Sequence, residues 1–334
     1  MTQKWMFVLV GAIAFCVGVS AQEVGKKAKL DGYAEWLRAD LLIVDGQRVR
    51  ANASTKFKGK RALGIADIQL GDEIRLSGVR DRDGAVLANE IEAKEDGKAL
   101  FEDDVLAVTD EMEELWVEEG MMFESSEDGE DIEIIGELIT SGPQPRRAQR
   151  ITQRLLPPYV SADDVRVYVV DSDEWNAAAM GNGALWIYSG LLDNLSDDEL
   201  AVIIGHELAH YTHEHSRRGA KSDLWMNILG LTLVQAAEAI DNEVLRATAQ
   251  IATLATMTGA LSKYSRNHED QADRVGLRYV HEAGYDVRQG PRLWERFRKK
   301  YGDGNKLLNF FMGGHSRPSE RARNLERELA LNYR

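Results

Sequence analysis

The sequence predicts an α+β protein in which a small all-β domain precedes a mainly helical domain that carries a small β-sheet. Two Asp-Gly turns, Asp45-Gly46 and Asp83-Gly84, each separate a pair of strand-like segments, which is a strong short-range signal for β-hairpins. Later in the chain, Ser196 followed by Glu199 forms the S-x-x-E pattern that opens a helix. A chain of 334 residues has room for both domains.

The composition is that of an ordinary globular protein with an excess of acidic residues. The chain has 41 basic and 55 acidic residues, and its net charge of −14 argues against a nucleic-acid partner. This excess is local, because Glu102 to Glu137 supply sixteen of the acidic residues and the stretch from Ala99 to Pro145 has no Lys or Arg.

Residues 1–21 have the pattern of a secretory signal peptide. Lys4 precedes an apolar run of 15 residues, Trp5 to Val19, and the small residues up to Ala21 suit cleavage before Gln22. The run is shorter than the ~20 residues that span a bilayer. We therefore expect a periplasmic protein, the alternative being an uncleaved anchor in the inner membrane. The only cysteine, Cys16, lies in this segment, so the mature chain is expected to have no disulfide.

Residues 22–100 are predicted to form a small β domain. Its two hairpins pair Leu41–Val44 with Arg48–Arg50, and Glu73–Arg80 with Ala85–Ala93. The turn spacing resembles that of the small β-barrel modules of unknown function in exported bacterial proteins. No residue here indicates chemistry, so a binding or positioning role and a purely structural role both remain open.

Residues 101–145 are predicted to be an acidic connector. Part of it has apolar residues at helical spacing, namely Val105, Val108, Met112, Leu115 and Trp116. The run from Glu124 to Asp131 indicates a solvated loop, and Ser141 to Pro145 marks a domain boundary.

Residues 146–334 form the second predicted domain. A short helix ends at Pro157-Pro158, and strands are expected at Val165–Val170 and Ala184–Tyr188, with a turn at Asn176–Gly183 between them. A long helical stretch at residues 223–261 has an apolar part that we interpret as a buried helix. A peripheral contact with the membrane surface is the alternative, but a membrane span is not expected.

A metal site is indicated by the sequence Gly-His-Glu-Leu-Ala-His at residues 205–210. Side chains four residues apart project from one face of a helix, and imidazole is a preferred zinc ligand, so His206 and His210 can hold one ion. Glu207 would then stand beside the open position of the metal, where it can take a proton from water.

Glu269 is the best candidate for the third ligand that a catalytic zinc needs. Asp273 follows it by one helical turn, and its carboxylate would accept the other ring N–H of a ligand histidine. His268 competes as a ligand but faces about 100° away from Glu269 on the helix. An acidic pair on a solvated helix face is the alternative to a metal role.

Small residues predict that the two metal-bearing helices approach each other closely. Ala201, Gly205 and Ala209 recur every four residues along the first helix. Glycine in a helix interior costs about 1 kcal/mol relative to alanine, which favours a packing reason for Gly205. Gly276 extends the face of Glu269 and Asp273, and it permits the same close approach from the second helix.

These motifs resemble those of the M48 family of zinc metallopeptidases. A histidine, His215, follows H-E-x-x-H by five residues, and the later motif reads Ser265-Arg266-x-x-Glu269-x-x-Ala272-Asp273-x-x-Gly276. The strand before the metal helix is also similar, and the likeness covers about residues 146–334. It implies a zincin-like domain with one zinc ion per chain, held by His206, His210 and Glu269, and Glu207 as the base. His213 is interpreted as a polar residue at the helix end.

The pair His315 and Arg321 resembles the C-terminal motif of the family. His315 is expected either to donate a hydrogen bond to an oxyanion or to bind the metal and inhibit the enzyme, unless it is a loop histidine without a role. Arg321 would steady the same oxyanion or anchor the loop. The sequence departs from the family at Gly181-Asn182, where Pro-Gly is usual, and at Ser316, where Pro is usual.

The resemblance implies a zinc endopeptidase that acts on polypeptides, and it suggests misfolded or unassembled envelope proteins as substrates of this exported chain. The strand Ala184–Tyr188 is expected to pair with an extended substrate. The alternative function is a zinc-binding chaperone or assembly factor with little proteolytic activity. The sequence does not indicate an oligomeric state.

Overall fold

The structure is a computed structural model that describes residues 24–38, 41–59, 64–69, 71–94, 102–125, 132–158, 160–215, 266–303 and 317–333. The expected signal peptide with Cys16, the helical stretch at 223–261, and His315 with Ser316 lie outside these residues. Within the described ranges, no helix is both long enough and apolar enough to cross a membrane.

The N-terminal domain is a barrel-like sheet, as predicted. Its strands are β1 (Lys27–Arg38), β2 (Leu41–Val44), β3 (Gln47–Arg50), β4 (Lys56–Lys58), β5 (Glu73–Arg80) and β6 (Val86–Lys94). They are ordered β3-β2-β1-β5-β6-β4, and an additional pairing of β3 with β6 closes the sheet on itself. Both predicted hairpins are confirmed, with Val44 opposite Gln47 and Arg80 opposite Val86. The interior is apolar and includes Leu42, Val49, Ile74 and Ile91.

The acidic segment that follows is packed on the C-terminal domain. It forms helix α1 (Glu102–Glu119) and the hairpin of β7 (Met121–Ser125) and β8 (Ile132–Glu137). Trp116 of α1 is 2% exposed and packs edge-to-face on Trp186, with ring centroids 4.8 Å apart. The predicted helix is therefore confirmed. The predicted loop was wrong at Glu124, which lies in β7, and its residues 126–131 lie outside the described part of the chain.

The C-terminal domain contains a three-stranded sheet of order β10-β11-β9. Strand β11 (Ala184–Tyr188) lies in the middle, antiparallel to β10 (Ala177–Ala179) and parallel to β9 (Arg166–Val170). β10 falls inside the segment predicted as a turn, because three alanines give no strand signal and the strand forms by pairing with β11. The side chains of β11 alternate between two apolar clusters, and all five are buried.

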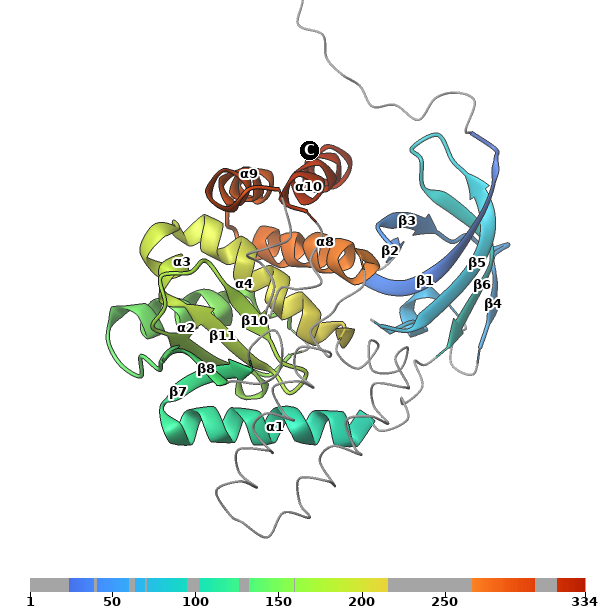
Figure 1. The fold of residues 1–334 in the computed structure, drawn as a ribbon. Coiled ribbons are helices and arrows are strands. Elements are labelled where there is room, and N and C mark those ends of the chain that lie inside the picture. Colours follow the sequence, from blue (N-terminus) through green and yellow to red (C-terminus); the bar gives the residue numbers. More distant parts are fainter. Residues whose placement is uncertain are drawn as a thin grey trace, which may run out of the picture.

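Helices cover both faces of this sheet (Figure 1). α1 lies on one side, and on the other α2 (Pro143–Leu155), α3 (Ser189–Asn194) and α4 (Asp197–Thr212) pack near α8 (Arg266–Glu282). The outer layer contains α9 (Gln289–Tyr301) and α10 (Pro318–Asn332). The capping box at Ser196 and Glu199 is present and begins α4, as predicted. The β domain lies beside the end of α8, where strand β1 contacts that helix.

Candidate metal centre

Two helices bring three potential metal ligands together. His206 and His210 lie one turn apart on α4, and their Nε2 atoms are 3.0 Å from each other. Glu269 of α8 places Oε2 3.5 Å from Nε2 of His206 and Oε1 3.3 Å from Nε2 of His210. All three side chains are buried, and they form a cluster of potential metal ligands in the described part of the chain.

This cluster fits a zinc ion. Ligands about 2.0–2.2 Å from a tetrahedral zinc ion lie roughly 3.3 Å from one another. The observed separations of 3.0–3.5 Å agree with that geometry. Two imidazoles and one carboxylate are also the donor set of a catalytic zinc site, which leaves the fourth position open. His268, the competing candidate, is instead stacked on His215 with ring centroids 4.7 Å apart.

Glu207 stands beside the ligands and is almost fully buried. The backbone N–H of Ala179 in β10 donates to its carboxylate, whereas Oε1 has no hydrogen-bond partner within the described residues. Burial raises the pKa of Glu207 to about 7, and the charge of Glu269 adds to this effect although His206 and Arg321 oppose it. A carboxylate with a pKa near neutrality can both accept and return a proton.

Asp273 and Arg321 contact His206, the first of the potential ligands. Asp273 Oδ1 lies 3.0 Å from His206 Nδ1, and the Arg321 guanidinium binds both carboxylate oxygens of Asp273, at 2.5 and 3.0 Å. Arg321 Nη2 is also 2.7 Å from His206 Nδ1. An Nδ1 that carries a proton cannot accept a hydrogen bond from arginine, so Asp273 is its partner when Nε2 is free for a metal. Arg321 therefore orients His206 by fixing Asp273.

His206, Asp273 and Arg321 shift one another's pKa values. Burial would raise the pKa of Asp273, but Arg321 and His206 outweigh it and hold that pKa at about 2. Burial and Arg321 would lower the pKa of His206, but Asp273 and Glu269 outweigh them and raise it to about 9. A metal that binds His206 must therefore displace a proton.

His210, the second potential ligand, is held by a series of hydrogen-bonded side chains that the sequence did not reveal. His210 Nδ1 lies 2.9 Å from Nδ1 of His215, whose Nε2 lies 2.7 Å from Oε1 of Gln271. The amide of Gln271 in turn donates to Glu35 of the β domain at 3.0 Å. Glu35 and Gln271 are 236 positions apart, so no spacing rule connects them. His213 ends α4 and contacts Thr212, which agrees with its expected place at the helix end.

The loop before β11 is tied to the acidic segment. Asn182, which occupies one of the positions that depart from the family pattern, donates to Glu113 of α1 at 2.7 Å. Arg166 forms a bidentate ion pair with the same glutamate, at 2.6 Å for both contacts. Helix α1 thus fixes the loop between β10 and β11, next to the strand that contacts Glu207.

Comparison with known proteins identifies the family. Residues 143–329, more than half of the chain, match the profile described as Peptidase family M48. The chain belongs to peptidase family M48. Residues 31–92 match a second profile, described as a domain of unknown function, DUF5666, and they coincide with the barrel-like domain.

Several M48-type proteins share the C-terminal half. Mitochondrial metalloendopeptidase OMA1 of Arabidopsis thaliana is 31% identical over 174 residues, which cover 50% of this chain and 33% of the relative. Metalloprotease YcaL of Escherichia coli is 27% identical, with 51% and 65% covered. A putative beta-barrel assembly-enhancing protease of Vibrio cholerae is 29% identical, with 52% and 37% covered. The chain thus spans between a third and two thirds of these relatives.

A solved structure, that of Ste24p from S. mikatae, also matches. It is 16% identical in sequence, and the match covers 67% of this chain and 56% of that chain with a TM-score of 0.39.

Proposed function

We propose that this M48-family protein is a zinc-dependent metalloendopeptidase. The observation that carries the proposal is the convergence of His206, His210 and Glu269 beside the buried carboxylate of Glu207. When bound, a zinc ion would supply Lewis acidity, which acidifies water and polarises the carbonyl of a peptide bond. His206, His210 and Glu269 would hold it, one ion per chain.

Glu207 performs the proton transfers in this proposal. It takes a proton from the attacking water and returns it to the amine that leaves when the peptide bond breaks. The Ala179 N–H holds one end of the carboxylate, and the pKa of about 7 suits both directions of transfer. Asp273 and Arg321 keep His206 oriented throughout.

Strand β10 is the edge at which we expect a substrate to bind. The expectation that Ala184–Tyr188 pairs with the substrate was wrong, because β11 already pairs with β10 on one side and β9 on the other. Among the described strands β10 is at the edge of that sheet, and its residue Ala179 contacts Glu207. An extended peptide that adds to β10 would present its backbone carbonyls to the metal ligands, and backbone pairing gives broad sequence tolerance.

The proposed substrates are misfolded or unassembled proteins of the cell envelope. The signal-like pattern of residues 1–21 supports export to the periplasm. Relatives in Vibrio cholerae and Yersinia pestis are named beta-barrel assembly-enhancing proteases, the former as putative, and this name supports substrates of that kind for this chain. The second candidate is a zinc-binding chaperone, because binding of an unfolded chain at β10 does not itself require cleavage.

Cleavage of unfolded casein by the wild type and Glu207→Gln tests the proposal. The variant is expected to retain zinc in elemental analysis and to lose about 10²–10⁴-fold in rate, because an amide cannot transfer the proton. Glu111→Gln, an exposed glutamate on α1, is the matched control and is expected to cleave normally. A wild type that binds zinc and suppresses aggregation without cleaving would favour the chaperone.

A further inference from the structure

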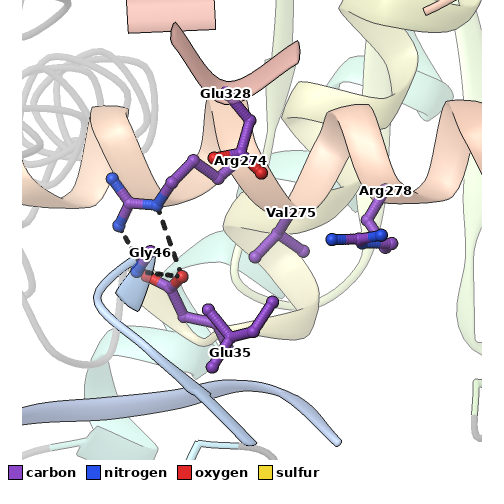
Figure 2. A pocket seen from close by; sticks show the side chains of 7 residues that line it. Glu35, Gly46, Arg274, Val275, Arg278 and Glu328 are labelled. Atoms are coloured by element: carbon purple, nitrogen blue, oxygen red, sulfur yellow. Dashed lines mark hydrogen bonds and ion pairs between the residues drawn. The ribbon is translucent and has the colours of Figure 1, made fainter. Parts of the chain in front are cut away.

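A buried carboxylate, that of Glu35 in β1, lies at the contact between the β domain and α8. Glu35 is 2% exposed, and it accepts hydrogen bonds from Gly46 N–H at 2.8 Å, Gln271 Nε2 at 3.0 Å and Arg274 Nη2 at 2.6 Å. Figure 2 shows the carboxylate beneath the Arg274 guanidinium, with Gly46 beside it. A Cβ at Gly46 would lie 2.7 Å from Cδ of Arg274, so the turn fits closely against this arginine.

Glu35 determines which way the amide of Gln271 points. A carboxylate can only accept hydrogen bonds, so Gln271 must direct its NH₂ group toward Glu35. Its Oε1 then faces His215 Nε2, at 2.7 Å. An amide oxygen also only accepts, so this nitrogen of His215 carries the proton.

The ring nitrogen that is protonated in His215 determines which ring nitrogen is protonated in His210. With one proton on Nε2, neutral His215 has a lone pair on Nδ1, which lies 2.9 Å from Nδ1 of His210. His210 must then donate from Nδ1, which leaves the lone pair on its Nε2. That atom is the one that faces His206 and Glu269.

We propose that Glu35 is a positioning residue for the metal centre, which acts through Gln271 and His215 to hold His210 in the tautomer that binds zinc through Nε2. The proposal rests on the proposed zinc-dependent function and assigns a role to the β domain within it. A histidine that donates its second ring N–H to a fixed partner is oriented and made a better ligand. Here the series of hydrogen bonds that ends at His210 begins in a different domain, at Glu35.

Substitution of Glu35 by glutamine in the full chain tests this role. The new amide places a donor against either Gln271 or Arg274, which disrupts the orientation of Gln271. We expect zinc affinity, measured by competition with a chelator, to fall about tenfold or more. We also expect ¹⁵N NMR of histidine-labelled, metal-free protein to show that His210 no longer carries its proton on Nδ1. The matched control is Asp31→Asn on the same strand, where the carboxylate is 73% exposed, and it should change neither quantity.

A second variant separates positioning from folding. Gln271→Met removes the hydrogen bonds that link Glu35 to His215 but leaves the ion pair of Glu35 with Arg274. The contact between the β domain and α8 therefore persists. It should weaken zinc binding as Glu35→Gln does, and the double variant should be no worse than either single variant. If Glu35→Gln does not fold, the zinc affinity and the His210 tautomer of Gln271→Met test the proposal.

Three results would overturn the proposal: wild-type zinc affinity in either variant, an unchanged His210 tautomer, or additive losses in the double variant. The His210 tautomer is measured in metal-free protein and does not depend on zinc binding. A wild type that fails to bind zinc would therefore refute the proposed function without deciding the role of Glu35.

Discussion

Gly276 of α8 lies against Gly205 of α4 so closely that a Cβ on Gly276 would be 2.7 Å from the carbonyl carbon and oxygen of Gly205. A Cβ on Gly205 would in turn lie 2.9 Å from the carbonyl oxygen of Gly276. These contacts are with backbone atoms, which cannot move aside as a flexible side chain can. The distance between the two helices, and hence between His206 and Glu269, depends on this pair.

Gly276→Ala is therefore expected to destabilise the protein and to weaken zinc binding together. Overpacking of this kind typically costs 1–3 kcal/mol, and the forced shift of α8 would move Glu269 away from the histidines. Urea unfolding and chelator competition measure the two effects. The matched control is Gly290→Ala in α9, whose new Cβ meets only the ends of two leucine side chains at 3.2 and 3.3 Å. Equal behaviour of the two variants would contradict the argument.

Glu269→Ala is expected to remove most of the bound zinc. The variant keeps both histidines but loses the carboxylate that α8 supplies to the cluster. Elemental analysis of the purified variant, with circular dichroism to verify its fold, measures the loss. A folded variant with the full complement of zinc would show that another side chain completes the site.

Asp273→Asn is expected to weaken zinc binding about 10–100-fold without abolishing it, because the ligands remain while the partner of His206 changes. An asparagine oxygen can still accept from His206, but it no longer pairs with Arg321 as a charge. Isothermal titration with zinc measures the change. An affinity equal to that of the wild type would remove Asp273 from the site.

Glu113→Gln should lower stability at neutral pH and have little effect in acid. Burial would raise the pKa of Glu113, but Arg166, Tyr168 and Asn182 outweigh it and lower that pKa. The charged form thus stabilises the fold above the unfolded pKa of about 4.3, and this contribution is lost as the pH falls through the lower folded value. We expect a loss of about 1–3 kcal/mol at pH 7.

Urea unfolding at several pH values, with exposed Glu111→Gln as control, measures this difference. A loss for Glu113→Gln that stays constant down to the acid limit of the folded state would contradict a charge-based role.

The sequence predicted those features that depend on neighbouring residues. Asp45 and Gly46 both have positive φ, 46° and 71°, as a two-residue hairpin turn requires, and their residue types signal that conformation. The capping box of α4 is equally local. The spacing of His206 and His210 follows from helix geometry alone, and the structure brings Glu269 to them across the glycine contact.

Features that depend on distant partners were not predictable in the same way. Glu35 and Glu113 are buried and charged. From the sequence, a glutamate is expected at the surface unless a residue that pairs with it in the core can be identified. Their partners lie on other elements far along the chain. Strand β10 was missed for the same reason, since its three alanines form a strand only against β11. His315 lies outside the described residues, and its role stays a prediction.

The strand edges of the β domain have a consequence for the proposed peptidase, whose substrates would be unfolded chains. The unpaired backbone groups of an edge strand can pair with another unfolded chain, and such pairing leads to aggregation. Pairing of β3 with β6 removes one pair of edges. The outer strand β4 has only three residues, Lys-Phe-Lys, and both lysines are exposed. Short length and positive charge are the features by which natural sheets discourage such addition. Under the proposed function, the barrel-like domain can thus lie beside α8 without binding the substrate chains that are expected to pair with β10.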